Sequence, residues 1–247
     1  MWHKAQGRGP RPYTDMHCHI LPGIDDGAVD WDDSLRIAMY AKESGAQRIV
    51  ATPHIMAGVF EPSPEEIRAK VQELQDLVDE RDLGIQVLPG SEVHLSESLC
   101  EDYLAGRLVP MGRSTHVLVE LPFHTLPGYA TDVLFHLRLS GAGVILAHPE
   151  RNDQIASDLG ILESLVSSGM LVQVDAGSLV GAYGQDVKTC VEKMVKRGMF
   201  HFIGSDAHTG SAGPVTERGA DIRPALRRLR RLCAGGQEGR VFREVGL

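Results

Sequence analysis

The sequence predicts an α/β protein whose parallel strands alternate with helices and close into a barrel. Seven short runs rich in Val, Ile and Leu lack the polar alternation of half-exposed strands, as in a parallel sheet covered on both faces. Helical stretches separate these runs, and a His, Asp or Glu residue closes nearly every one. A barrel brings all its strand ends to one mouth, whereas the alternative, a doubly wound sheet, offers only the loops at its switch point. The barrel therefore accounts better for the His, Asp and Glu residues that end nearly every strand.

The expected strands cover residues 13–17, 48–53, 85–89, 116–121, 143–147, 171–175 and 201–204. The expected helices cover residues 33–44, 64–82, 131–140, 160–168, 186–197 and 221–233. The second helix has the clearest signals, because Ser63 can cap it, Pro64 takes its first position and Glu66 completes a capping box. Gly45 is expected to end the first helix and Gly84 the second.

Length and composition favour one large domain. Of the 247 residues, 1–12 are expected to form a flexible tail and 13–247 a single folded domain. The formal net charge of −8 argues against a broad nucleic-acid-binding surface. No signal peptide is recognisable, and no apolar run approaches the ~18 residues of a membrane helix. The four cysteines lie far apart, which indicates reduced thiols and a cytoplasmic location.

The strand ends carry candidate metal ligands. Residues i and i+2 of a strand share a face, so His17 and His19 can bind one ion while Cys18 points away. One such pair is a weak signal, because a histidine is often structural. The joint pattern is stronger, because ordinary strand ends would also carry Lys, Ser and Asn. The candidate ligands are His17, His19, Asp26, His54, Glu92, Glu120, His148, Asp206 and His208.

This set of donors indicates two or three divalent metal ions. Imidazole nitrogens and carboxylate oxygens suit manganese, which is expected here, with iron or zinc as alternatives. The absence of cysteine ligands argues against a structural zinc site. Three divalent ions with four carboxylates leave a charge of about +2, which suits a phosphate dianion, and clustered ions generate hydroxide at neutral pH.

Arg151 follows His148 by three residues, just beyond the same strand. It is placed to reach the mouth and to bind phosphate through the donors of its guanidinium group. The alternative is a solvated surface arginine. Of the histidines outside the metal pattern, His124 is the one expected to line the mouth.

Five motifs are specific as a set: Asp15-Met-His-Cys-His-Ile-Leu-Pro-Gly-Ile-Asp-Asp-Gly27, Ala51-Thr-Pro-His54, Gly90-Ser-Glu92, Ala147-His-Pro-Glu-Arg151 and Ser205-Asp-Ala-His208. Over residues 13–210 the chain resembles the PHP (polymerase and histidinol phosphatase) superfamily. It is most similar to the bacterial tyrosine-protein phosphatases of capsular and exopolysaccharide synthesis. The resemblance implies a distorted (β/α)7 TIM-like barrel with a trinuclear metal site at the carboxyl ends of the strands.

The resemblance also implies how the ligands are shared. The first metal would be held by His17, His19, Glu92 and Asp206. Glu92 would bridge to the second metal, which Glu120 and His148 complete, and the third would be held by Asp26, His54 and His208. The expected catalytic residues are Arg151, Asp206 and His208, with His208 or a water supplying a proton to the leaving oxygen.

One departure concerns a second arginine, which the family places a few residues after its Asp-x-His motif. Here no arginine follows His208 until Arg218. Either Arg218 folds back to bind the substrate or that role is absent. The arginine-rich segment 223–231 is expected to be a solvated cover helix, with docking of an acidic partner as the alternative.

The function expected from the resemblance is hydrolysis of phosphotyrosine in proteins by a metal-dependent phosphatase. The expected partner is an autophosphorylated bacterial tyrosine kinase of polysaccharide synthesis and export. The sequence has no Cys-x5-Arg loop, so a phosphocysteine intermediate is not expected. The alternatives are a small-molecule phosphatase of the histidinol-phosphate type, a nucleic-acid phosphoesterase and a phosphate-binding regulatory module without catalysis.

Overall fold

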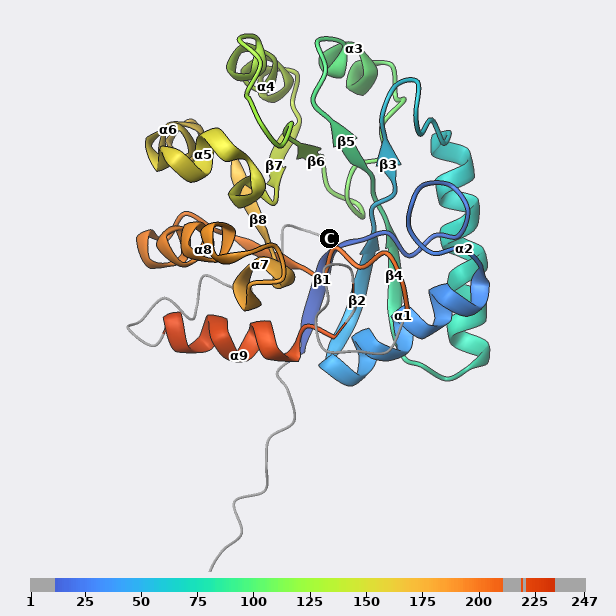
Figure 1. Ribbon diagram of the computed structural model, residues 1–247. Coiled ribbons are helices and arrows are strands. Elements are labelled where there is room, and N and C mark those ends of the chain that lie inside the picture. The colour runs from blue at the N-terminus through green and yellow to red at the C-terminus, as the bar shows by residue number, and fades with distance from the viewer. Residues whose placement is uncertain (1–11, 211–218, 220, 234–247) are drawn as a thin grey trace, which may run out of the picture.

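The computed structural model describes residues 12–210, 219 and 221–233 and has an α/β fold built on parallel strands (Figure 1). Two expectations concern residues outside this part. Of the tail expected at residues 1–12, only residue 12 is described. Arg218 also lies outside the described residues.

The strands form two sheets, in the order β1-β2-β4 and β3-β5-β6-β7-β8-β9, and each ladder within them is parallel. Their bounds are β1 Tyr13–Cys18, β2 Ala46–Ala51, β3 His54–Ile55, β4 Gln86–Pro89, β5 Glu92–His94, β6 His116–Glu120, β7 Gly143–Ala147, β8 Leu171–Asp175 and β9 Phe202–Gly204. All seven predicted strands are therefore present, each with bounds within about two residues of the expectation.

Two of the predicted strands are each followed, after a break, by a short strand that the sequence did not predict. β2 gives way to β3 after two residues, and β4 to β5 after two residues, with the register Ala51↔Pro89 resumed at His54↔Glu92. Pro53 lies in the first break and has no backbone N–H to donate to a ladder. The two sheets are thus connected through a pair of interrupted strands.

The first and last strands lie side by side, but no continuous ladder joins them in the described residues. A single bridge pairs Cys18 with Ala207, where His19 N donates to Ala207 O at 2.9 Å. Asp206 N also donates to His17 O at 2.9 Å. The α/β fold with parallel sheets is confirmed, while the closed seven-stranded barrel stays a prediction.

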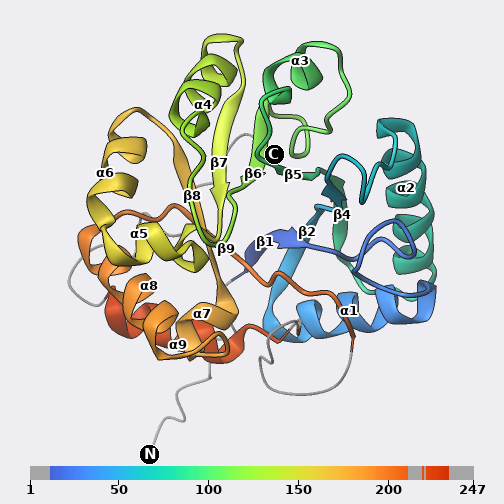
Figure 2. The ribbon, with the colours of Figure 1, turned by 45° about the horizontal axis from the view of Figure 1, so that its top comes forward.

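The helices lie around the outside of the sheets (Figures 1 and 2). Their bounds are α1 Trp31–Ser44, α2 Pro64–Glu80, α3 Leu99–Leu104, α4 Ala130–Leu139, α5 Asp153–Ser157, α6 Leu159–Ser167, α7 Ala176–Val180, α8 Gln185–Arg197 and α9 Arg223–Leu232, with the 3-10 turn η1 at Pro149–Arg151. The sequence did not predict α3, α5, α7 or η1, because elements of three to six residues are too short to show helical periodicity.

The predicted N-cap of α2 and the predicted end of α1 are confirmed. Ser63 Oγ accepts a hydrogen bond from Glu66 N at 3.1 Å, and Gly45 ends α1 with φ of 100°. Helix α2 ends at Glu80, two residues before the expected end, because Asp82 and Gly84 both take positive φ values. No helix in the described part of the chain is long and apolar enough to cross a membrane.

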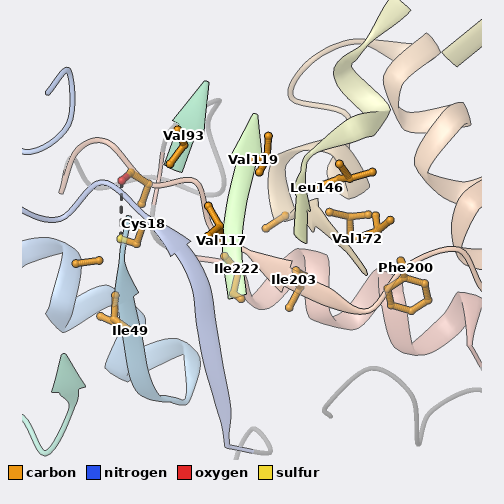
Figure 3. Close-up of a cluster of buried hydrophobic side chains, with 14 of the residues drawn as sticks. Cys18, Ile49, Val93, Val117, Val119, Leu146, Val172, Phe200, Ile203 and Ile222 are labelled. Atoms are coloured by element: carbon orange, nitrogen blue, oxygen red, sulfur yellow. Dashed lines mark hydrogen bonds between the residues drawn. The ribbon is translucent and has the colours of Figure 1, made fainter. Parts of the chain in front are cut away.

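Two apolar clusters cover the two faces of the strands. The larger one packs the outer faces against the helices, and Figure 3 shows Val117, Val119 and Leu146 within it. Cys18 also belongs to this cluster, where its Sγ contacts Ala207 O at 3.8 Å (Figure 3). The smaller cluster lies on the inner faces and contains Met16, Val50, Met111, Leu118, Ile145, Ala147 and Phe202. Because residues i and i+2 share a face, Leu118 in this cluster and Glu120 at the end of β6 both face inward.

Candidate metal centre

The nine ligands predicted from the sequence come together at the carboxyl ends of the strands. Every one of them belongs to at least one group of three or four side chains with ligand atoms within 4.8 Å of one another. The groups are His19, Asp26, His54 and His208; His17, His19 and Glu92; His54, Glu92 and Glu120; and His148, Asp175 and Asp206.

The tightest arrangement surrounds the bridge predicted at Glu92. His17 Nε2 lies 2.9 Å from His19 Nε2, and these atoms lie 3.1 and 3.2 Å from Glu92 Oε2. Asp206 Oδ1 lies 3.4 Å from His17 Nε2 and 3.3 Å from His19 Nε2. Each of these two carboxylate oxygens therefore lies within 3.4 Å of both imidazole nitrogens, and the four residues are those that the resemblance implied for the first metal. Asp206 is also grouped with His148 and Asp175.

These distances fit a shared divalent ion. Donors bound at about 2.0–2.2 Å from one ion lie about 3–3.5 Å from one another. Glu92 Oε2 is buried and makes no hydrogen bond of good geometry, although His17, His19 and His54 each place a nitrogen within 3.2 Å of it. A buried carboxylate oxygen without a hydrogen-bond donor is costly, and coordination to a cation removes that cost.

The other carboxylate oxygen of Glu92 faces the residues expected for the second metal. His148 Nε2 lies 3.0 Å from Glu92 Oε1 and 3.8 Å from Glu120 Oε1. Glu92 thus presents one oxygen to each of two groups, as a bridging carboxylate would. Glu92 can face both groups because it lies at the start of β5, beside His54 of β3.

The residues expected for the third metal lie at the more open edge. Asp26 Oδ1 lies 3.3 Å from His208 Nε2 and 3.6 Å from His54 Nε2. The side chain of Asp26 is 36% exposed, whereas His208 is 6% exposed. His19 adjoins the same group, since its ring lies 4.0 Å from that of His208.

Neighbouring side chains orient the two histidines of the first strand. Gln173 Oε1 lies 3.1 Å from His17 Nδ1, and Asp25 Oδ2 lies 2.8 Å from His19 Nδ1. Each partner accepts the Nδ1 proton, which leaves Nε2 as the inward-facing donor. Gly204 keeps room for this arrangement, because a Cβ there would lie 2.5 Å from His17 Cβ and 2.7 Å from Gln173 Nε2.

Backbone strain is concentrated at two candidate ligands. His148 has φ of 28° and Asp206 has φ of 52°, and of the described residues other than glycine only Asp82 shares a positive φ. Such conformations cost free energy and persist where the surrounding structure imposes them, often at functional sites. His148 directly follows β7, and Asp206 is the second residue after β9, so both lie at the carboxyl ends of strands.

The electrostatics of the centre favour a cation. Burial by itself lowers the pKa of His148, but the carboxylates of Asp175 and Glu92 raise it to about 10. Burial likewise opposes a charge on His17, while Glu92 and Asp206 raise its pKa. The field of the carboxylates thus retains positive charge on buried imidazoles, and a divalent ion would supply that charge while releasing the protons.

Arg151 lies at the centre as predicted and is not a solvated surface residue. Its Nη1 donates to Asp206 Oδ2 at 2.9 Å and to Asp175 Oδ2 at 3.3 Å. Its Cζ lies 4.7 Å from the Phe123 ring and 4.3 Å from the Tyr183 ring. Its side chain is 21% exposed, so the guanidinium group is held at the edge of the centre.

Sequence reasoning missed Asp175, which is buried and grouped with His148 and Asp206. The signal was available, because Asp175 also ends a predicted strand. It also missed His94, whose Nδ1 lies 3.3 Å from Glu120 Oε2. The expectation that His124 lines the mouth is not met: its side chain is 89% exposed and pairs with Asp153 at 2.8 Å, and the preceding Phe123 contacts the centre instead.

The family profile described as "Capsular polysaccharide synthesis, CpsB/CapC" matches residues 13–242. The chain is 36% identical to the tyrosine-protein phosphatase YwqE of Bacillus subtilis (strain 168) over 194 residues, which cover 78% of this chain and 76% of that protein. A crystal structure from work on YwqE of B. subtilis and CpsB of Streptococcus pneumoniae, metal-dependent tyrosine phosphatases, superposes with a TM-score of 0.82 at 34% identity. It covers 88% of this chain and 86% of that one. A histidinol phosphate phosphatase of Lactococcus lactis, at 13% identity and a TM-score of 0.55 over 89% and 93% of the two chains, shares the fold.

Proposed function

Because the chain belongs to the CpsB/CapC family of capsular polysaccharide synthesis, we propose that it is a metal-dependent phosphatase that hydrolyses phosphotyrosine in proteins. The observation that carries this proposal is that Glu92 and Asp206 each place a carboxylate oxygen within 3.4 Å of the Nε2 atoms of both His17 and His19, with Arg151 hydrogen-bonded to Asp206. Relatives that are tyrosine phosphatases support the reaction and the substrate class.

We propose that the centre binds two or three divalent ions, manganese first, with iron or zinc as alternatives. His17, His19, Glu92 and Asp206 would hold the first; Glu92, Glu120 and His148 the second; and Asp26, His54 and His208 the third. Such ions supply positive charge to phosphoryl oxygens and lower the pKa of water toward neutrality. The nitrogen and oxygen donors without thiolates support this choice of metals.

The protein's own residues would position and protonate the substrate. Arg151 would bind the phosphoryl oxygens, since its Nη1 already lies 2.9 Å from Asp206 at the edge of the centre. His208 Nδ1 donates a hydrogen bond to the carbonyl oxygen of Asp206 at 2.9 Å, which leaves Nε2 facing Asp26 Oδ1 at 3.3 Å. We propose His208 or a water as the source of the proton for the leaving tyrosyl oxygen. We retain Arg218 as a candidate second phosphate ligand.

The proposed partner is an autophosphorylated bacterial tyrosine kinase of polysaccharide synthesis and export. Support comes from the family and its relatives. A histidinol phosphate phosphatase shares the fold, so small phosphate monoesters form the second candidate class of substrate. Nucleic acid is the weakest candidate, because a net charge of −8 repels a long phosphate backbone outside the site.

We also propose that residues 13–247 form one domain after a tail at residues 1–12, and that its strands close as a distorted (β/α)7 barrel. The bridge between Cys18 and Ala207 supports closure. A cytoplasmic location is proposed because none of the four cysteines forms a disulfide.

A turnover panel tests the function. Protein purified without chelator and supplemented with manganese should release phosphate from phosphotyrosine peptides faster than from phosphoserine peptides, histidinol phosphate or an oligonucleotide. Elemental analysis should find more than one manganese, iron or zinc per chain. A metal content near zero after supplementation would refute the metal centre. Preferred turnover of histidinol phosphate would retain the metal centre but reject the tyrosine substrate.

A further inference from the structure

Phe123 is an exposed aromatic side chain at the mouth of the metal centre. It follows β6 and is 41% exposed. Its ring stacks on His148 with centroids 5.9 Å apart and planes 23° apart, and it lies 4.7 Å from Arg151 Cζ. Phe135, the other exposed phenylalanine of the described residues, contacts His136, which is not a candidate ligand. Ligand sites are lined mainly by apolar and aromatic side chains beside a few polar groups, and Phe123 occupies such a position beside Arg151.

The position of Phe123 is fixed before any substrate arrives. Its carbonyl oxygen accepts a hydrogen bond from Asp153 N at 2.7 Å, and Asn152 Nδ2 donates to the carbonyl of Pro122. The loop after β6 is thereby hydrogen-bonded to the segment that follows Arg151. A ring held in this way loses little conformational entropy when a ligand packs against it.

The floor of the centre is closed to the leaving group. The bottom of the centre is closed, because His17 and Glu92 are fully buried and the inner apolar cluster lies beneath them. A phosphoryl group bound by Arg151 must therefore direct its ester oxygen away from this floor, and on the Arg151 side the exposed edge carries Phe123. In an aryl phosphate a single oxygen joins the ring to phosphorus, so the ring emerges within stacking range of Phe123, about 4.5–7 Å between centroids. A phosphoserine side chain places only one methylene there.

We propose that Phe123 is a specificity-determining residue that packs against the phenyl ring of phosphotyrosine. The proposal rests on the proposed phosphatase function and adds a reason for preferring aryl over alkyl phosphates. The contact is noncovalent and acts alongside Arg151, which binds the phosphoryl group common to both classes.

The test compares an aryl with an alkyl ligand in Phe123→Ala and Phe123→Leu. The readouts are kcat/KM for a phosphotyrosine peptide and the inhibition constants of phenylphosphonate and methylphosphonate, which are not hydrolysed. Phe123→Ala should lower kcat/KM for the phosphotyrosine peptide and raise the inhibition constant of phenylphosphonate, each by about three- to tenfold. This is the range expected for loss of an aromatic pair. The inhibition constant of methylphosphonate should change by less than about twofold, because it has no ring to stack. Phe123→Leu should give a smaller loss for the aryl ligand, because leucine keeps apolar contact but not the ring.

Phe135→Ala is the matched control, because Phe135 is 48% exposed on α4, where its ring contacts His136. It should leave both inhibition constants unchanged. Equal weakening of the two phosphonates by Phe123→Ala would mean that the ring only supports Arg151, and this would overturn the proposal, as would no change in either. If the unmodified protein hydrolyses no phosphate ester, the proposed function fails. Calorimetric titration of the metal-loaded protein with the same phosphonates still tests Phe123.

Discussion

The inner faces of the strands carry two buried layers of opposite chemistry. In the lower layer, side chains such as Leu118 and Ile145 pack against one another without polar groups. In the upper layer, which is similarly buried, His17 lies 3.1 Å from Glu92 and His148 lies 3.8 Å from Glu120. Glu92 and Leu118 are register partners on β5 and β6, so the boundary between the layers falls between adjacent residues.

The difference shows what each layer contributes. Apolar packing stabilises the fold whether or not an ion is bound. Clustered charges are costly to bury and are retained where they bind a cation or substrate. Substitutions in the lower layer should therefore reduce stability and spare metal binding, whereas substitutions in the upper layer should reduce metal binding and turnover.

Glu92→Gln should have the largest effect. Loss of one carboxylate that faces two groups of ligands removes charge from both, and we expect kcat/KM to fall by at least about a hundredfold, since changes outside the ligand shell alone cost 10–100-fold. The rise in Tm on adding manganese, which measures binding to the folded state, should shrink or vanish. Steady-state kinetics, elemental analysis and thermal melts check this. A variant with normal metal content and turnover would show that Glu92 is not a bridge.

Leu118→Ala should show the reverse. Removing a fully buried leucine from the lower layer should lower the free energy of unfolding by about 2–5 kcal/mol, as measured by urea denaturation. The manganese-dependent rise in Tm should persist, and kcat should change little below the melting temperature. If Leu118→Ala also abolished metal binding, the two layers would not be separable.

Arg151→Ala tests the edge of the upper layer. It should leave metal content intact and lower kcat/KM by about tenfold or more, in line with the 1.5–3 kcal/mol of a charge-assisted hydrogen bond. Arg151→Lys should recover only part of the loss, because lysine lacks the planar fork of donors. Unchanged kinetics in the alanine variant would remove Arg151 from the phosphate site.

Asp221→Asn, outside both layers, should have the smallest effect. Burial by itself raises the pKa of Asp221, but hydrogen bonds from Arg223 and Ser44 lower it overall. A carboxylate with a lowered pKa in the folded state adds stability above its unfolded pKa of about 3.9, and this stability is lost as the pH falls through the folded pKa. The variant should lose less than about 1 kcal/mol at pH 7, because Arg223 is exposed. Urea denaturation at pH 7 and pH 3 should show the difference narrowing at the lower pH; a constant difference would contradict the linkage.

The sequence was sufficient to predict features that depend on local pattern. The strands 143–147 and 171–175 have the predicted bounds, because a run of apolar residues specifies a strand buried on both faces. The nine candidate ligands could be named for a related reason. A His, Asp or Glu that ends such a run lies at the carboxyl edge of a parallel sheet, wherever the neighbouring strands come from.

Only the tertiary structure decided which side chains meet. Gln173 orients His17 from 156 residues away, and Asp175 pairs with an arginine 24 residues earlier in the chain. Neither contact leaves a local signature in the sequence. The breaks after β2 and β4, and the placement of Phe123 rather than His124 beside Arg151, likewise depend on how distant segments pack. The physical reason is that burial pattern and chain direction are encoded residue by residue, whereas orientation and electrostatic environment arise from contacts that exist only when the whole chain has folded.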